Sequence, residues 1–190
     1  MSYVFGSISS AIIVCKLAGL EDPRVTGSKN PGVTNVLRIG GKKLALITLL
    51  GDTLKGFIPT FIAVVFGFSD SVIALVALMA FIGHLFPVFF RFQGGKGIAT
   101  AFGVVFGLNW YLGFFVALVW IIIATLFKYS SLAGLLSFLS APFWAKYYFN
   151  SSWEIFFALL TISILTTMRH KTNILRLLSG DESKIVFRAR

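Results

Sequence analysis

Four glycines and a lysine interrupt an otherwise apolar region between Gly83 and Thr100, and three of these glycines surround Lys96 in the run Gly94-Gly95-Lys96-Gly97. Closely spaced glycines let backbone N–H groups approach a phosphate, and a following helix start and a lysine add positive charge. The run is not a Walker loop, because it lacks the leading glycine and the hydroxyl residue after the lysine. We predict a phosphate cradle, and a flexible loop without a ligand is the alternative. His84, in the same region, is predicted to be structural.

A second polar segment, from Gly27 to Asn35, combines hydroxyl and amide side chains with backbone donors. Its polar side chains are Ser28, Lys29, Asn30, Thr34 and Asn35. Arg24 and Arg38 flank it, and the nearest carboxylates come before Arg24. Such a donor-rich segment suits an anion. An ordinary solvated turn would explain its glycines and proline but not the repeated hydroxyls and amides, so we favour a binding function.

A third polar segment follows the last apolar region and begins Arg169-His170-Lys171-Thr172-Asn173, with Arg176 shortly after. The basic cluster fits two roles, a stop-transfer signal against lipid headgroups or part of a binding site. Charge alone does not separate these roles.

Several chemistries are excluded by absent residue patterns. Neither His84 nor His170 has an aspartate five positions later, so the His-x-x-x-x-Asp acyltransferase arrangement is missing, and no Gly-x-Ser-x-Gly elbow occurs. Two histidines and the single Cys15 make a zinc site or a disulfide unexpected. We therefore predict no metal and no cofactor, with Cys15 a small buried side chain.

The composition places these polar segments in a membrane protein. Of 190 residues, 57% are hydrophobic and 13% are charged, and the mean hydropathy is +0.88. This is too apolar for a soluble domain of that length, and the apolar character continues to about residue 168. The basic residues that give the net charge of +10 lie between apolar spans. The positive-inside rule or anionic ligands therefore explain this charge better than nucleic-acid binding does. We predict one integral membrane domain over residues 1–190.

We expect an all-α, polytopic fold with seven transmembrane helices joined by polar loops. The expected spans are about 3–20, 44–68, 71–90, 100–108, 110–127, 132–148 and 154–168, of which the fourth is short. The segment 21–43 is too rich in glycine, proline and asparagine for a long helix. Asp52 and Lys55 share one face of the second span, where charged groups face a protein interior or a polar cavity.

Seven spans put the loops after the first, third, fifth and seventh on one side, and these four segments are rich in lysine and arginine. The opposite loops carry almost none, with Lys146 the exception. The positive-inside rule therefore predicts an external amino terminus and cytoplasmic polar loops. A continuous helix from 98 to 127 would break this parity and move the basic tail outside. The three polar segments are expected to converge on one cytoplasmic site.

The motifs closely resemble those of the bacterial membrane-bound glycerol-3-phosphate acyltransferases that use acyl-phosphate, the PlsY type. The family pattern Gly-Ser-Gly-Asn-Pro-Gly-Ala-Thr-Asn matches Gly27 to Asn35, with Lys29 replacing a glycine and Val33 an alanine. The family pattern Gly-His-x-Phe-Pro with Phe-x-Gly-Gly-Lys-Gly-x-Ala-Thr matches residues 83–100 without a break. The third, Arg-His-x-x-Asn-Ile-x-Arg-Leu-x-x-Gly-x-Glu, matches residues 169–182, and Asp52-x-x-Lys55-Gly56 resembles the family's second helix.

The resemblance implies transfer of a fatty acyl group from acyl-phosphate to the sn-1 hydroxyl of glycerol 3-phosphate, giving lysophosphatidic acid and phosphate. It implies catalytic positions at Ser28, Lys96, His170 and Asn173. It implies substrate-binding positions at Asn30, Thr34, Asn35, Arg38, Gly94, Gly95, Gly97, Arg176 and Glu182. The implied setting is the bacterial inner membrane, with glycerol 3-phosphate, acyl-phosphate and membrane lipid as partners and a monomeric protein.

Roles within the site stay open at this point. Lys96 and the surrounding glycines are expected to hold one phosphate, and Arg38 and Arg176 the other. His170 is the leading protein base, but a substrate phosphate can also take the proton. Ser28 as an acylated nucleophile is the second choice. The rival function is a small anion or lipid-phosphate transporter, suggested by Asp52 and Lys55, although no convincing internal repeat accompanies it.

Overall fold

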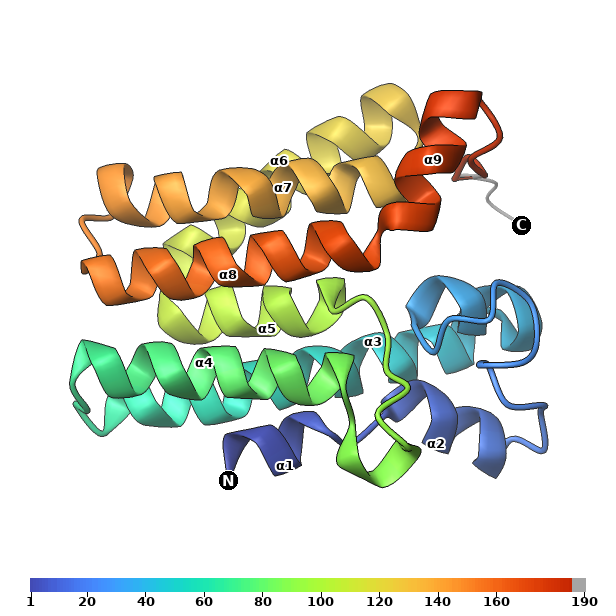
Figure 1. The fold of residues 1–190 in the computed structure, drawn as a ribbon, viewed down its shortest axis with the longest axis horizontal. Coiled ribbons are helices and arrows are strands. Elements are labelled where there is room, and N and C mark those ends of the chain that lie inside the picture. The colour runs from blue at the N-terminus through green and yellow to red at the C-terminus, as the bar shows by residue number, and fades with distance from the viewer. Residues whose placement is uncertain (186–190) are drawn as a thin grey trace.

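The computed structural model describes residues 1–185, and within them every regular element is helical (Figure 1). The α-helices are α1 (Ser2–Gly6), α2 (Ser10–Leu17), α3 (Val33–Val65), α4 (Asp70–Leu85), α5 (Ile98–Leu108), α6 (Trp110–Phe127), α7 (Ser130–Phe143), α8 (Trp153–Arg169) and α9 (Lys171–Ser179). A 3-10 turn, η1 (Val88–Phe90), follows α4, and a π-helical turn, η2 (Trp144–Tyr148), follows α7. The last five residues of the basic tail lie outside the described range.

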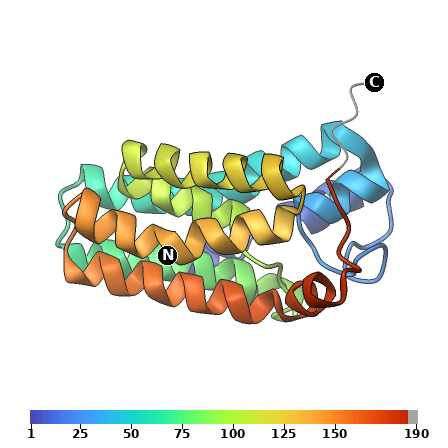
Figure 2. The ribbon, with the colours of Figure 1, turned by 90° about the horizontal axis from the view of Figure 1, so that it is seen from above.

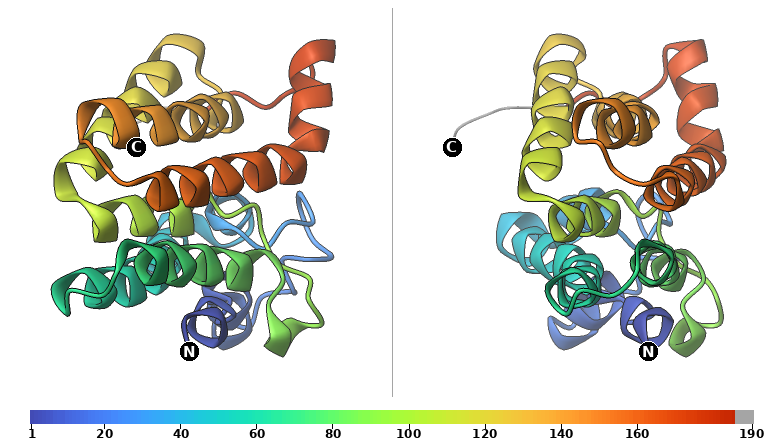
Figure 3. Two further views of the ribbon diagram at one scale, coloured as in Figure 1. Left: turned by 60° about the vertical axis from the view of Figure 1, so that its left-hand side comes forward. Right: turned by 90° about the vertical axis from the view of Figure 1, so that its left-hand side faces the viewer.

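Most helices run along one long axis in two groups. Figure 1 shows α1 to α5 in one group and α6 to α8 in the other, and the two views in Figure 3 separate these groups. Helix α5 packs against both α3 and α6, while α4 packs against α8, so these pairs join the groups. The short α9 turns away at one end of the bundle (Figure 2).

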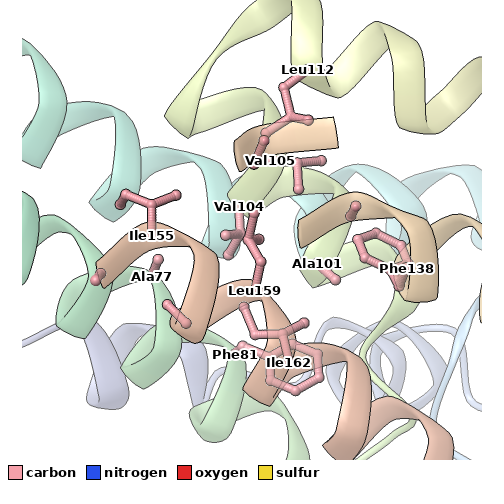
Figure 4. Close-up of a cluster of buried hydrophobic side chains, with 14 of the residues drawn as sticks. Ala77, Phe81, Ala101, Val104, Val105, Leu112, Phe138, Ile155, Leu159 and Ile162 are labelled. Atoms are coloured by element: carbon pink, nitrogen blue, oxygen red, sulfur yellow. The ribbon is translucent and has the colours of Figure 1, made fainter. Parts of the chain in front are cut away.

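The core lies where α4, α5, α7 and α8 meet. Phe81, Val104, Phe138 and Ile162 are almost completely buried there (Figure 4), and Leu85 belongs to the same cluster. Small residues bring the backbones close: a Cβ on Gly103 would lie only 1.9 Å from the carbonyl oxygen of Thr53, across the contact between α3 and α5. Such close approach is a principal means of packing helices in a membrane, where the surrounding lipid is as apolar as the side chains.

The predicted first span, residues 3–20, is not one helix but two. The chain leaves the helical conformation at Ser7 to Ser9, between α1 and α2. The carbonyl of Ile8, freed by this break, accepts a hydrogen bond of 2.7 Å from the ammonium of Lys55. A buried lysine on α3 thus satisfies the carbonyl group that the break leaves without a helical partner. The apolar pattern of residues 3–20 did not reveal this break.

Helix α3 begins earlier than predicted. The expectation of a non-helical segment from 21 to 43 is wrong for residues 33–40, because both prolines and two of the four glycines lie before Val33 and the other two, Gly40 and Gly41, come at the end of this stretch. Gly41, with a φ of 80°, absorbs a kink inside the helix. The helix therefore carries Thr34, Asn35 and Arg38 on its first turns.

The other boundaries agree closely with the sequence. Asn109 ends α5 and caps α6 by accepting hydrogen bonds from the N–H groups of Tyr111 and Leu112 at 2.9 and 3.1 Å, so residues 98–127 form two helices. Within residues 1–185, three helical stretches are long and apolar enough to cross a bilayer: Val33–Val65, Asp70–Phe90 and Trp110–Phe127. The protein is thus an all-helical membrane protein with several spans.

Candidate active site

The polar segments meet at one end of the bundle. Arg24 of the first loop donates to the carbonyl of Phe90 at 3.1 Å, and Arg169 of α8 donates to the loop after η1. Near the opposite end lies Lys146, with its ammonium 4.6 Å from the ring of Trp153. These contacts bring the three polar segments together at one end of the bundle.

The glycine loop, residues 94–97, is packed tightly against the end of α4. A Cβ on Gly94 would lie 2.0 Å from the carbonyl oxygen of His84, and a Cβ on Gly97 would lie 2.3 Å from the ring of Phe81. Gly97 also has a φ of 87° as it starts α5. A Cβ on Gly95 would lie 2.4 Å from Nε2 of His84 and 2.8 Å from the carbonyl oxygen of Pro31. The glycines thus serve close packing, and they bring the first loop against the second.

Lys96 points toward the third polar segment. Its ammonium donates a hydrogen bond to Oδ1 of Asn173, whose amide donates to Oε1 of Glu182 at 2.7 Å. Burial, together with the positive charges of Arg176, Arg169 and Arg38, lowers the pKa of Lys96 to about 8, although Glu182 acts in the opposite direction. These four basic residues, Lys96, Arg38, Arg169 and Arg176, are called the cationic cluster below.

Glu182 organises one side of this cluster. Its carboxylate accepts hydrogen bonds from Ser131 at 2.6 Å, from Asn173 and from the guanidinium of Arg176 at 2.8 Å. Burial alone would raise the pKa of Glu182, but the bonds from Ser131, Arg176 and Asn173 hold it below its usual value. A charged carboxylate repels phosphate, so we interpret Glu182 as a residue that positions Asn173 and Arg176.

His170 lies buried between α8 and α9. Its Nδ1 lies 2.8 Å from the carbonyl oxygen of Thr166, so Nδ1 carries the hydrogen and Nε2 is the basic nitrogen at neutral pH. Burial lowers the pKa of His170 to about 4, despite the bond to Thr166, with Lys96 and Arg169 adding to the effect. The imidazole is therefore neutral, and it is a weak base.

The first loop is folded around the side chain of Asn35. This buried amide accepts from the N–H of Ser28 at 2.8 Å and donates to the carbonyls of Pro23 and Thr26 at 2.9 and 3.0 Å. Asn35 thus holds the loop in shape. Lys29 has a φ of 56°, the left-handed conformation that the family's glycine adopts most easily. The substitution preserves this turn despite the added side chain.

The remaining predicted residues of this segment line the same end of the molecule. Ser28, Thr34 and Arg38 are exposed, and Asn30 is half-buried beside Gly32. Arg38 projects from the first turns of α3, close enough to Lys96 to affect its pKa. Exposed donors around a half-buried lysine can bind a polar ligand from the aqueous side.

Two residues at the site were absent from the sequence-based set. Arg169 donates from Nε to the carbonyl of Gly95 at 3.1 Å and from a terminal nitrogen to Gly94 at 2.7 Å. Ser131, at the start of α7, contacts Glu182. Arg169 lies next to His170 in the third motif, and this position in the sequence could have identified it as a site residue. Ser131 lies in the first turn of α7, where the sequence carries no such signal.

A second buried polar cluster lies deeper in the bundle. Lys55 and Asp52 form an ion pair of 2.8 Å, and Nδ1 of His84 lies 3.9 Å from the same carboxylate. All three side chains are buried. Because Lys55 also bonds to the carbonyl of Ile8, its charge is fully used within the protein. The predicted polar face of α3 is therefore a structural contact of α3 with α4 and with the break between α1 and α2.

Unlike the paired Lys55, the cationic cluster has more positive than negative charge, and this excess indicates the chemistry of the site. The cationic cluster has four basic residues and one carboxylate, Glu182, among its close neighbours. Such an excess of positive charge, next to a glycine loop at the start of α5, suits one or two phosphate groups.

Comparisons with known proteins agree with this chemistry. A family model described as glycerol-3-phosphate acyltransferase matches residues 1–180. Glycerol-3-phosphate acyltransferases of Burkholderia multivorans and Methylococcus capsulatus are 51% and 50% identical to this chain; the matches cover 97% of this chain in both cases, and 88% and 92% of the relatives.

Two crystal structures of PlsY, an integral membrane glycerol 3-phosphate acyltransferase, have the same fold. The glycerol 3-phosphate form matches with a TM-score of 0.93 and 40% identity, covering 97% of this chain and 92% of that one. The lysophosphatidic acid form matches with a TM-score of 0.90 and 39% identity, covering 96% and 91%. The similarity therefore extends over nearly the whole chain.

Proposed function

Because this chain belongs to the glycerol-3-phosphate acyltransferase family, we propose that Lys96, Arg38 and Arg176 of its cationic cluster bind the phosphates of glycerol 3-phosphate and of an acyl-phosphate donor. The protein is a membrane enzyme of phospholipid synthesis that acylates glycerol 3-phosphate and produces lysophosphatidic acid. The observation that carries the proposal is the excess of positive charge around Lys96, where one carboxylate faces four basic residues.

The proposed reaction is a direct transfer. The sn-1 hydroxyl oxygen of glycerol 3-phosphate attacks the carbonyl carbon of the acyl-phosphate, an ester bond forms, and the bond to the phosphate oxygen breaks. Inorganic phosphate leaves and takes the hydroxyl proton. Acyl-phosphate already has a good leaving group, so the protein mainly holds the two substrates together and neutralises charge.

Each proposed role follows from the position of the residue. Lys96 and the glycine loop hold one phosphate, while Arg38 and Arg176 hold the other. Asn173 places the ammonium of Lys96, and Glu182 in turn places Asn173 and Arg176. Ser28 and Thr34 supply exposed polar groups, and Asn30 a half-buried one, on the first loop and at the start of α3.

A direct transfer is favoured over an acylated serine. Nucleophilic serines are activated by a hydrogen bond to a base. In the described residues, the hydroxyl of Ser28 makes no hydrogen bond to a histidine or a carboxylate. A substrate phosphate is also preferred over His170 as the proton acceptor, because burial leaves this histidine with a pKa of about 4.

The proposed membrane arrangement has seven spans in one domain, with α1 and α2 together forming the first and α3 to α8 the others. The basic end faces the cytoplasm of a bacterial cell and the amino terminus lies outside, as the positive-inside rule requires. The enzyme acts as a monomer, because the groups assigned to the two substrates come from one chain.

The proposal is tested with the purified protein in detergent, supplied with palmitoyl phosphate and glycerol 3-phosphate. We expect lysophosphatidic acid and phosphate in equal amounts, and no product when palmitoyl-CoA replaces palmitoyl phosphate. Turnover with the CoA ester alone would overturn the proposed donor. Absence of product from folded protein with either donor would contradict the acyltransferase function itself.

A further inference from the structure

The guanidinium of Arg169 is held by backbone carbonyls instead of a carboxylate. Two different nitrogens of its planar fork donate to the neighbouring carbonyls of Gly94 and Gly95, at 2.7 and 3.1 Å. The side chain is half-buried, and the guanidinium lies 5.8 Å from the ring of Phe86. Among residues 1–185, no acidic side chain lies within ion-pair distance of Arg169.

These two hydrogen bonds fix the direction of two N–H groups. In a trans peptide the C=O and N–H groups point in opposite directions. The carbonyl of Gly94 shares its peptide plane with the N–H of Gly95, and the carbonyl of Gly95 shares its plane with the N–H of Lys96. By binding both carbonyls on one side, Arg169 turns both N–H groups toward the other side.

The two N–H groups so directed are available to a ligand. Within the described part of the chain, neither the N–H of Gly95 nor that of Lys96 donates to a protein acceptor. Both come directly before the Cα of Lys96, from which its side chain departs. Successive backbone N–H groups next to a lysine form an anion-binding concavity.

We propose that Arg169 is a positioning residue that orients the N–H groups of Gly95 and Lys96 toward a substrate phosphate; this rests on the proposed function of the glycine loop. Arg169 acts through the backbone and does not touch the substrate. The close contact between Gly95 and the ring of His84 also limits how far the loop can move. The loop is therefore held by both α4 and Arg169.

The geometry requires arginine and not simply a positive charge. A lysine carries the same charge but has no planar fork that binds two neighbouring carbonyls at once. Arg169→Lys therefore separates orientation from electrostatics, and Arg169→Gln removes both. Arg91→Lys, at an exposed arginine just after η1 and before the glycine loop, is the matched control for the substitution type, and Lys171→Gln is the control for loss of charge.

The test measures binding of glycerol 3-phosphate and of inorganic phosphate by calorimetry in detergent, and KM and kcat for both substrates. Loss of two charge-assisted hydrogen bonds should weaken phosphate binding about 10- to 100-fold in both Arg169 variants, with KM changing more than kcat. The controls should bind like the parent protein. Millimolar guanidinium should partly restore phosphate binding to Arg169→Ala, an effect that a purely structural role would not produce.

The outcomes separate the two proposals. Parent-like binding by Arg169→Lys would overturn the positioning role and leave the acyltransferase function intact. The positioning role is supported if Arg169→Lys and Arg169→Gln lose phosphate binding without a change in melting temperature and if guanidinium restores binding to Arg169→Ala. Should the parent protein make no lysophosphatidic acid, the proposed function fails, while the binding measurements still decide the role of Arg169.

Discussion

Lys55 and Lys96 are both removed from bulk water, yet their surroundings differ in one respect. The ammonium of Lys55 lies 2.8 Å from the carboxylate of Asp52 and 2.7 Å from the carbonyl of Ile8. The ammonium of Lys96 bonds to the neutral amide of Asn173, among three arginines and one carboxylate that other groups already occupy. The first lysine is fully neutralised by the protein, and the second is not.

This difference provides a criterion for deciding whether a charged residue in a membrane protein indicates a ligand. A charge inside a membrane helix is expensive, so a functional role is the usual first assumption. The pair on α3 suggested a transporter on that ground, but its contacts explain it as a structural tie between helices. The site is identified by positive charge that no protein group balances. Four changes test this contrast.

The largest expected effect is on stability and comes from Lys55→Met. The substitution leaves Asp52 without its partner and the carbonyl of Ile8 without a donor. Breaking a buried pair in this way costs about 3–5 kcal/mol of the free energy of unfolding. Unfolding of the protein in detergent, followed by circular dichroism, measures the change.

Two further variants make this result specific. Lys16→Met, at an exposed lysine of α2, should leave stability nearly unchanged, and the double variant Asp52→Asn, Lys55→Met should be more stable than Lys55→Met alone. An unchanged unfolding transition for Lys55→Met would show that the pair is not a structural tie.

Lys96→Met should give the opposite pattern, with parent-like stability and a large loss of activity. Removing one preorganised donor to a charged group costs about 10²–10³ in rate. Steady-state turnover with palmitoyl phosphate and glycerol 3-phosphate measures it. Lys171→Met, at an exposed lysine of α9, should keep most of the activity. Similar losses in both variants would indicate that only the total charge at this end matters.

The pH dependence of kcat/KM sharpens the comparison further. Because the pKa of Lys96 is lowered to about 8, this ammonium is charged below pH 8 and loses its proton above it. A required ammonium therefore predicts a kcat/KM that falls about tenfold per pH unit above this value. Rates between pH 6 and 9.5, corrected for spontaneous donor hydrolysis, test this. A flat profile to pH 9.5 would exclude a required charge on Lys96.

His170→Gln should have the smallest effect. The imidazole has a pKa of about 4 and donates to the carbonyl of Thr166, a bond that the glutamine amide can also make. A general base contributes about 10²–10⁴ to the rate, so a loss below about tenfold would exclude that role. The rate at pH 7 decides between them, and a loss of a hundredfold or more would restore His170 as the base.

The sequence was sufficient for the helical class, most helix ends and the convergence of the polar segments. Asn109 and Gly97 mark boundaries through local rules, since one caps a helix and the other adopts a positive φ. Apolar periodicity and loop charge provided the rest. Family resemblance then indicated the chemistry of the three motifs.

What the sequence did not reveal depends on contacts between distant segments. The break at Ser7 to Ser9 is possible because Lys55, from another helix, binds the free carbonyl. The role of Arg169 depends on the path of a loop more than 70 residues earlier in the chain. The use of Asn35 within its own loop and of Glu182 as a positioning residue also required their partners in space.

The hydrogen bonds of Glu182 have a consequence for biogenesis. Membrane helices insert in order during synthesis, but this carboxylate, which follows α9 in the chain, connects α7 with Asn173 and Arg176. The helices α1 to α9 can therefore be in place while the catalytic pocket is still unfinished. A nascent chain stays inactive until the segment that carries Glu182 has been made and has docked against α7.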